Sequence, residues 1–289
     1  MKIGFIGLGI MGCRMAANLQ RHGNELVIYN RTPDKAATLL ERGAQWAESP
    51  AVVAAQVDIL FTMLATPAAV QATALNEQGL LDALEPGSLW VDCSTVNPSF
   101  TRQMAEQARR RQIRFLDAPV AGSKVPAEQA QLLFLVGGEA ADIEVCQPLF
   151  QAMGRQVIHV GGHGQGTALK MVFNLLLGET MLAFVEALTL GQSAGIALDT
   201  LLEALLNAPL ASPVLKAKRT LFETGDFAPE FPLQWMRKDL QLASTTAYEN
   251  GIALPAVNLA KEIYGLAERQ GLGPQDFAAV YRWLRQSQE

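Results

Sequence analysis

Apolar and helix-like segments alternate from residue 1 to about residue 160. The apolar runs are short and rich in β-branched and aliphatic residues, while segments 33–42 and 98–111 begin with proline and end in basic residues, as helices often do. This alternation predicts a parallel sheet with helices on both faces. The predicted strands are 2–6, 26–29, 58–63, 89–92, 114–117, 132–136 and 157–159.

The alternation ends at a glycine cluster, Gly161 to Gly166, and the rest of the chain has helical patterns. The predicted helices are 167–193, 198–206, 233–249, 255–270 and 274–286. We therefore expect an α/β fold: a Rossmann-type doubly wound sheet followed by an all-α C-terminal domain. The boundary near Gly162 divides the chain into a dinucleotide-binding domain, 1–162, and a helical substrate and dimerisation domain, 163–289.

The longest apolar stretch, 171–191, has the length of a membrane span. Asn174, Glu179 and Glu186 interrupt it at positions that would be costly in lipid, so a buried helix explains it better. Hydrophobic residues make up 49% of the chain and charged residues 18%, with a formal net charge of -5. This balance argues against nucleic acid and membrane as partners.

Cysteine and histidine positions give no sign of a disulfide framework or a metal site. Three cysteines, Cys13, Cys93 and Cys146, lie far apart, and the three histidines lack neighbouring ligands at metal-like spacing. No secretory signal opens the chain. A cytoplasmic protein without metal is expected.

The first predicted strand leads directly into a glycine-rich loop. Gly7-Leu8-Gly9-Ile10-Met11-Gly12 is a G-x-G-x-x-G sequence between a strand and a helix, as dinucleotide binding requires. The glycines permit a tight turn, backbone approach to a pyrophosphate, and close packing of helix on strand. An ordinary tight turn is the alternative, but the position in a repeated strand-helix pattern favours binding, so we assign all six residues to the cofactor site.

The end of the second strand bears on the choice of cofactor. NAD-binding domains usually place a carboxylate there, but this chain has Asn30-Arg31-Thr32. Arg31 can pair with a 2′-phosphate, and Asn30 and Thr32 can donate hydrogen bonds to it, which favours NADP over NAD. The alternative is a solvated turn arginine. Met63 and Leu64, after the strand 58–63, are also assigned to the cofactor site.

With three further motifs, the chain resembles the β-hydroxyacid dehydrogenase family, which includes 3-hydroxyisobutyrate dehydrogenase and the glyoxylate and succinic semialdehyde reductases. The resemblance spans essentially the whole chain. The motifs, in family order, are 4–12, Asp117-Ala118-Pro119-Val120-Ala121-Gly122-Ser123, then 164–170 through Asn174, and Lys238-Asp239-Leu240.

The resemblance implies that Lys170 is the catalytic acid or base and that Asn174 orients the substrate. Positions i and i+4 share one face of a helix, so the two side chains can reach one small substrate together. Without the motif, a solvated lysine near a helix end would be the better interpretation of Lys170.

The resemblance also assigns Gly122 and Ser123 to a loop that binds the substrate carboxylate. Ala121 stands where the family commonly has serine, so one hydroxyl contact is missing, for which Ser123 can compensate. The continuation 123–128 looks most like the glyoxylate and succinic semialdehyde reductase branch. An ordinary strand-to-loop exit would fit the local chemistry equally well.

Three more positions follow from the family pattern. Thr95, beside Ser94, matches a position near both nicotinamide and substrate, although these hydroxyls also suit a helix cap before Pro98. Phe231 and Asp239 match substrate-binding positions, and Lys238 matches a lysine that approaches the cofactor. Alone, Lys238 and Asp239 would be an ordinary surface pair.

The sequence thus predicts an NADP-dependent oxidoreductase that reduces a small aldehyde acid, of the glyoxylate or succinic semialdehyde type, with Lys170 as general acid or base. A 3-hydroxyisobutyrate or tartronate semialdehyde dehydrogenase is an alternative of the same kind. An imine reductase and a non-catalytic nucleotide-binding module are alternatives of other kinds. The helical domain of the family suggests a homodimer or homotetramer.

Overall fold

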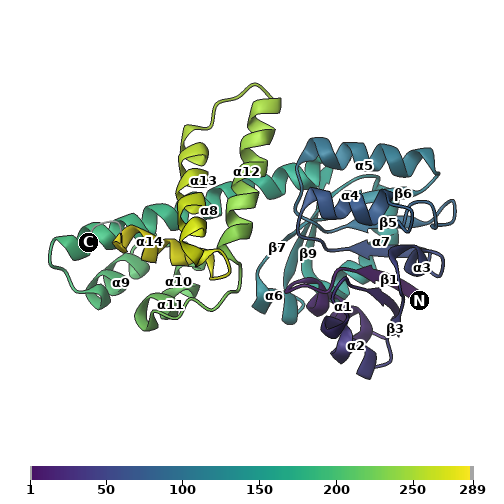
Figure 1. Cartoon of the computed structure of the whole chain (residues 1–289), viewed down its shortest axis with the longest axis horizontal. Helices are drawn as coiled ribbons and strands as arrows, with labels where there is room; N and C mark the ends of the chain where they lie inside the picture. The colour runs from purple at the N-terminus through teal and green to yellow at the C-terminus, as the bar shows by residue number, and fades with distance from the viewer. Residues whose placement is uncertain (1, 287–289) are drawn as a thin grey trace. The chain divides into compact units, whose positions relative to one another are not determined.

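The computed structural model describes residues 2–286 and divides the chain into two compact units (Figure 1). One unit spans Met1–Met171 and the other Val172–Glu289. The long helix α8, Gln165–Ser193, is shared, because its first turns belong to the first unit and the remainder to the second. The sequence boundary at residue 162 lies three residues before this helix begins.

The first unit is built on one twisted sheet with the order β3-β2-β1-β4-β5-β6-β8-β7, and β9 pairs with β8. Strands β1 to β6 are parallel, whereas β8 runs antiparallel to β6 and β7. The strands are β1 Lys2–Ile6, β2 Glu25–Tyr29, β3 Gln45–Trp46, β4 Ile59–Thr62, β5 Leu89–Asp92, β6 Arg114–Asp117, β7 Val120–Ala121, β8 Leu132–Gly137 and β9 Gly154–Gly161.

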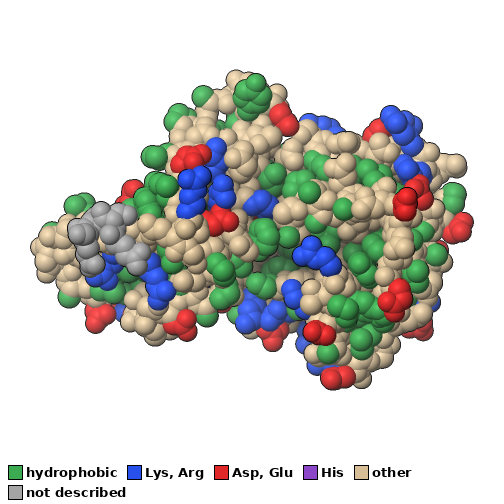
Figure 2. Space-filling view, viewed as in Figure 1, with side chains coloured by type: hydrophobic (Ala, Val, Ile, Leu, Met, Phe, Trp, Pro, Cys, Tyr) green, Lys and Arg blue, Asp and Glu red, His purple; other side chains and the backbone are tan. Residues whose placement is uncertain are grey.

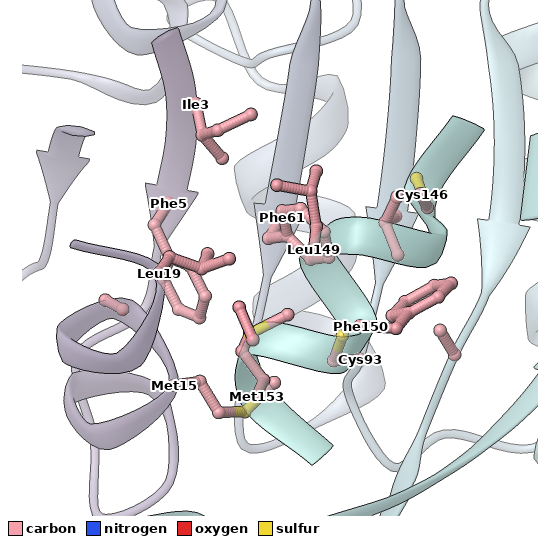
Figure 3. Packing of buried hydrophobic residues seen from close by; sticks show 14 of the residues in the cluster. Ile3, Phe5, Met15, Leu19, Phe61, Cys93, Cys146, Leu149, Phe150 and Met153 are labelled. Atoms are coloured by element: carbon pink, nitrogen blue, oxygen red, sulfur yellow. The ribbon is translucent and has the colours of Figure 1, made fainter. Parts of the chain in front are cut away.

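Successive residues of a strand point to opposite faces of the sheet. Because these strands are apolar on both faces, helices cover both faces of the sheet. Ile3 and Phe5 of β1 join one apolar cluster and Ile6 joins the other. Figure 3 shows the first cluster, in which Met15 lies beside Met153 and Leu19 lies beside Phe5. The helices of this unit are α1 Gly12–Arg21, η1 Pro33–Ala36, α2 Ala37–Glu41, α3 Pro50–Ala54, α4 Pro67–Leu75, α5 Pro98–Arg110, α6 Lys124–Glu128 and α7 Ala140–Met153.

The second unit is helical. Its core gathers buried residues of α8, such as Met181 and Val185, with Leu240 of α12 and Tyr264 of α13. The antiparallel pair α12 and α13 is plain in Figure 1. Besides the end of α8, the helices are α9 Leu198–Asn207, α10 Pro213–Ala217, α11 Arg219–Thr224, α12 Leu233–Glu249, α13 Pro255–Ala267, η2 Glu268–Leu272, η3 Phe277–Ala279 and α14 Val280–Gln286.

Some expectations from the sequence need correction. The sheet is not wholly parallel, and β3 and β7, each two residues long, were not predicted. Helices α10 and α11 lie between the predicted helices 198–206 and 233–249, where no helix was predicted. The helix predicted over 255–270 is α-helical only to Ala267. It is followed by the π-helix η2, Glu268–Leu272, in which Gly271 has a left-handed φ of 84°.

Helix α8 is the one helix within residues 2–286 that is long and apolar enough to cross a membrane by length and composition. Met181, Val185 and Leu188 are nonetheless buried in the helical core. We therefore interpret α8 as the central helix of a folded domain. On the face drawn in Figure 2, acidic and basic side chains are interspersed rather than gathered by sign.

Candidate active site

The glycine loop after β1 has the geometry of a dinucleotide cradle. Gly7 has a φ of +99°, which glycine adopts without a Cβ penalty, and its N–H donates to the Tyr29 carbonyl at 3.0 Å. A Cβ on Gly12 would lie 1.9 Å from the Gly7 carbonyl oxygen, whereas a Cβ on Gly9 would meet no atom within 4 Å. Gly12 therefore closes the turn onto α1, while Gly9 faces open space where a pyrophosphate would approach.

Asn30 braces this loop from the end of β2. Its Oδ1 accepts the Leu8 N–H at 2.8 Å, and its Nδ2 donates to the Thr32 carbonyl at 2.8 Å. Asn30 was predicted to donate a hydrogen bond to a 2′-phosphate, and the bond to Thr32 uses one of the two hydrogens of its amide. Arg31 and Thr32 are exposed at this position.

A buried network connects the loops after β4 and β5. The Asp92 carboxylate accepts the Thr62 hydroxyl at 2.8 Å and the Ser94 N–H at 3.1 Å. The Ser94 hydroxyl in turn accepts the Leu64 N–H at 2.9 Å, and Trp90 Nε1 donates to the Thr62 hydroxyl at 2.9 Å. These bonds fix the two loops that carry the predicted cofactor residues.

The loops meet at one edge of the sheet. A Cβ on Gly7 would lie 2.3 Å from the Met63 carbonyl oxygen and 2.9 Å from the Leu64 side chain, so the glycine loop and the β4 loop are in close contact. Thr95, half-buried, follows Ser94 on the adjoining loop. This edge lies at the carboxyl ends of parallel strands, where doubly wound sheets bind their ligands.

Two buried acidic groups at this edge have altered acidity. Burial raises the pKa of Asp92, and the bonds from Ser94 and Thr62 lower it in part. Burial likewise raises the pKa of Asp117, opposed by bonds from Gly164 and Thr167. The Cys93 thiol, also buried, has a pKa well above its ordinary value, so it is held neutral.

Lys170 lies in the second turn of α8, half-buried, and belongs to the first unit together with the glycine loop. The start of α8 is held by Asp117 at the end of β6, whose carboxylate accepts the Gly164 N–H at 2.9 Å and the Thr167 N–H at 2.8 Å. The predicted carboxylate-binding loop also belongs to this unit. Gly122 has a φ of +125° and is exposed, and Ser123 directly precedes α6.

The second unit brings three of the predicted residues together. Asn174 Nδ2 donates to Asp239 Oδ2 at 2.5 Å, and both side chains are buried. Asp239 Oδ1 lies 2.8 Å from Lys238 Nζ, so the carboxylate sits between an amide and an ammonium group. Because its amide donates to Asp239, Asn174 has a fixed orientation, with one N–H and its carbonyl oxygen to offer a ligand.

Phe231, half-buried, lies in the segment before α12. Its N–H donates to Asp276 Oδ2 at 3.2 Å, and its ring centroid is 5.8 Å from that of Phe277. The backbone of Phe231 is thus fixed by a buried carboxylate.

Sequence reasoning missed the structural roles of Asp92 and Asp117. Both acids end an otherwise apolar strand, and a carboxylate so placed must find donors. An acid at the end of an apolar strand was therefore the sequence signal that could have indicated a structural role for Asp92 and Asp117. Among residues 2–286, no group of three or more metal-ligating side chains is assembled. The open cradle at Gly9, by contrast, fits a dinucleotide pyrophosphate.

The fold and the cradle define a nicotinamide-dinucleotide dehydrogenase, and comparison with known proteins agrees. Residues 2–161 match the model for the NAD binding domain of 6-phosphogluconate dehydrogenase. Residues 164–284 match the model described as NAD-binding of NADP-dependent 3-hydroxyisobutyrate dehydrogenase.

Curated relatives and a solved structure match over nearly the full length. The chain is 35% identical to glyoxylate/succinic semialdehyde reductase 1 of Arabidopsis thaliana, covering 100% of both chains. It is 38% identical to 2-(hydroxymethyl)glutarate dehydrogenase of Eubacterium barkeri, covering 98% of this chain and 94% of that one. A 3-hydroxyisobutyrate dehydrogenase of Mycobacterium tuberculosis, determined with L-serine, superposes with a TM-score of 0.87 at 28% identity, covering 98% and 99%.

The chain belongs to the β-hydroxyacid dehydrogenase family, the 3-hydroxyisobutyrate dehydrogenase-like group. It is an NAD(P)-dependent oxidoreductase that acts on CH-OH groups.

Proposed function

We propose that this enzyme uses NADPH to reduce a small aldehyde acid, of the glyoxylate or succinic semialdehyde type, to the hydroxy acid, with Lys170 as the general acid. The observation that carries the proposal is that Lys170 is anchored, through the start of α8, to the same compact unit as the glycine loop. The full-length similarity to a glyoxylate/succinic semialdehyde reductase supports the substrate class.

The preference for NADP over NAD is supported by the end of β2. Arg31 and Thr32 are exposed there, and no carboxylate stands at residues 30 to 32 to repel a 2′-phosphate. A guanidinium can pair with a phosphate through two hydrogen bonds, whereas it gives little to a ribose hydroxyl. Asn30 contributes by bracing the loop through Leu8.

Lys170 supplies the proton in the proposed reaction. The bound nicotinamide supplies the hydride for reduction, or accepts it for oxidation. A lysine ammonium, with an ordinary pKa of about 10.4, is protonated at neutral pH and can donate to the alkoxide that develops on the carbonyl oxygen. In oxidation, Lys170 would act in its neutral amine form and take the hydroxyl proton.

The substrate carboxylate would be bound by Gly122 and Ser123, and Asn174 would orient the substrate through the face of its amide turned away from Asp239. Lys238, proposed to approach the cofactor, is paired with Asp239 at 2.8 Å. Its charge is therefore already balanced inside the second unit. In this proposal Gly122 and Ser123 belong to domain 1–162, and Asn174 and Lys238 belong to domain 163–289.

A spectrophotometric panel tests this function. Glyoxylate and the succinic, methylmalonate and tartronate semialdehydes are assayed with NADPH and with NADH, alongside a cyclic imine. Consumption of NADPH with an aldehyde acid is expected. Turnover of the imine alone would instead indicate imine reduction, and NADPH binding without any turnover would indicate a non-catalytic module.

Two variants test the proposed roles of Lys170 and Arg31. Lys170→Ala should lower kcat by about 10²-fold or more while the Kd for NADPH stays unchanged, because general acid catalysis typically contributes about 10² to 10⁴-fold. Lys216→Ala, at an exposed lysine of α10, is the control. Arg31→Ala should raise the KM for NADPH and leave that for NADH, and an equal effect on both would remove the 2′-phosphate assignment.

We also propose that the enzyme is a cytoplasmic homodimer or homotetramer. Leu176 and Leu190 of α8 are 64% and 72% exposed in the single chain, and a second copy would cover such apolar surface. All three cysteines are free, which suits a reducing compartment. Light scattering should give a mass two or four times 31.2 kDa, and a monomer at micromolar concentration would contradict the assembly.

A further inference from the structure

One buried carboxylate organises the first turn of α8. Asp117 Oδ1 accepts the Gly164 N–H at 2.9 Å, and Asp117 Oδ2 accepts the Thr167 N–H at 2.8 Å and the Thr167 hydroxyl at 3.0 Å. The N–H groups at the start of a helix have no partner within it, so a carboxylate there is a strong cap. Both oxygens of Asp117 are thereby used.

A second threonine hydroxyl, on α5, adjoins this cap. The Thr167 hydroxyl is 3.0 Å from the Thr101 hydroxyl on α5, and all three side chains are 1% exposed. The Thr167 hydroxyl can donate its one proton to the Thr101 hydroxyl, to Asp117 Oδ2 or to the Gly164 carbonyl at 3.2 Å. The cap therefore links α5, β6 and α8 in one network.

Two glycines allow close packing at this contact. A Cβ on Gly166 would lie 2.4 Å from the Leu135 carbonyl oxygen, so the helix start is pressed against the sheet. A Cβ on Gly137 would lie 2.5 Å from Asp117 Oδ1, so the carboxylate occupies space that a side chain would fill. The helix start and the carboxylate are therefore both packed closely against β8.

We propose that Asp117 is a positioning residue for Lys170, fixing the rotation and height of α8 so that the ammonium group of Lys170 is held for proton transfer. Lys170 is three residues after Thr167 and therefore one turn further along on the same side of the helix. Loss of the cap would loosen the first turn and displace Lys170, and a displacement of about 1 Å in a reacting group can cost about 10²-fold in rate. This inference rests on the proposed catalytic role of Lys170.

The first test is a graded series of variants. Asp117→Asn replaces one acceptor oxygen by a donor and leaves one helix N–H facing an amide. Thr167→Val removes only the hydroxyl, and Thr167→Ser restores it. We expect kcat to fall by about 10 to 100-fold in Asp117→Asn and by less in Thr167→Val, with recovery in Thr167→Ser and an unchanged Kd for NADPH.

The matched control is Asp142→Asn. Asp142 is a largely buried acid of the same unit that pairs with Arg114 at 2.9 Å, away from the start of α8. Its kcat should stay at the wild-type value although its thermal stability falls. Thr167→Val carries the test if Asp117→Asn does not fold. An unchanged kcat in a folded Asp117→Asn, or in Thr167→Val, would overturn the proposal.

A double variant separates positioning from a general structural effect. If Asp117 acts through Lys170, adding Asp117→Asn to Lys170→Ala should change the residual rate by less than about twofold. If Asp117→Asn lowers the rate by the same factor in the wild type and in Lys170→Ala, the positioning role is refuted and the catalytic role of Lys170 is unaffected. Full turnover by Lys170→Ala itself would instead refute the catalytic role of Lys170, and with it this proposal.

Discussion

At the scale of single residues, Gly9 and Gly12 serve one loop for different physical reasons. Gly12 is required by the protein itself, since a Cβ there would lie 1.9 Å from the Gly7 carbonyl oxygen. Gly9 has open space around the position of its missing Cβ, so the fold alone does not require glycine. We attribute the glycine at this position to the predicted cofactor, whose pyrophosphate would have to approach the backbone closely.

This difference predicts opposite behaviour of two alanine variants. Gly9→Ala should leave the thermal midpoint of the free protein unchanged and raise the Kd for NADPH by about tenfold or more, a loss of about 1.4 kcal/mol. Gly12→Ala should lower the unfolding free energy by about 1 to 3 kcal/mol through overpacking. Calorimetry and cofactor titration measure both effects. Gly162→Ala, at another uncrowded glycine, should change neither.

Asp92 predicts a pH effect on stability. Burial raises its pKa in the folded state, so the fold accommodates the neutral carboxyl best. Its contribution to the unfolding free energy is present below the ordinary pKa and is lost as the pH rises through the raised value. Asp92→Asn, neutral at every pH, should therefore gain stability relative to wild type as the pH rises above about 4, the ordinary pKa of an aspartate.

Urea unfolding of Asp92→Asn and wild type at several pH values gives this difference directly. Contributions from Asp117 and other groups occur in both proteins and cancel. A difference that stays constant or shrinks with rising pH would contradict the assignment of the raised pKa to Asp92.

At the scale of elements, periodicity predicted the long and strongly patterned segments well. The strands 2–6, 89–92 and 114–117 and the helix 233–249 have the predicted bounds. In these segments the secondary structure favoured by the local pattern is the one that the tertiary contacts also favour. The glycine loop was predictable for the same reason, because its chemistry is local.

The remaining elements depend on tertiary contacts that no local pattern contains. The strand β7 has two residues and exists because Val120 and Ala121 pair with β8. The antiparallel direction of β8 depends on chain connection, since an apolar run such as 132–137 suits either direction. Likewise, the pairing of Asp117 with Thr167 spans 50 positions in sequence, so only the structure shows it.

The segments joining the short helices α10 and α11 to α12 depend on a buried ion pair. Lys218 Nζ lies 2.8 Å from both Asp276 and Glu230, and Asp276 also accepts the N–H groups of Glu230 and Phe231. The side chains of Lys218 and Asp276 are 4% and 0% exposed. This pair therefore fixes the approach to α12.

Lys218→Met should lower the unfolding free energy by about 3 to 5 kcal/mol, because Asp276 would remain as a buried charge without its partner. Adding Asp276→Asn should cost less than the sum of the two single losses. Lys216→Met, at an exposed neighbour, should stay within about 0.5 kcal/mol of wild type. Strict additivity in urea unfolding would show that the pair is not coupled.

At the scale of the whole molecule, two separate cores share one continuous helix. The sheet unit has an apolar cluster on each face of the sheet, and the helical unit has its own around α8 and α12. The predicted cofactor residues Gly7 to Gly12, Arg31, Met63 and Thr95 all belong to the first unit. Of the predicted cofactor residues, only Lys238 belongs to the second unit, so we expect cofactor binding to stabilise mainly the first core.

This division predicts a local response to the cofactor. NADPH at about 100 times its Kd should stabilise the sheet unit by about 2.7 kcal/mol, since it binds only the folded state. Amide hydrogen exchange should slow at residues 7–12, 30–32, 63–64 and 92–95, and remain unchanged in α9, α10 and α11. Gly9→Ala at the same NADPH concentration is the control, because weaker binding should reduce the protection in proportion. Equal protection of α9 to α11 would mean that the helical unit takes up cofactor energy directly, which would contradict the separation of the two cores.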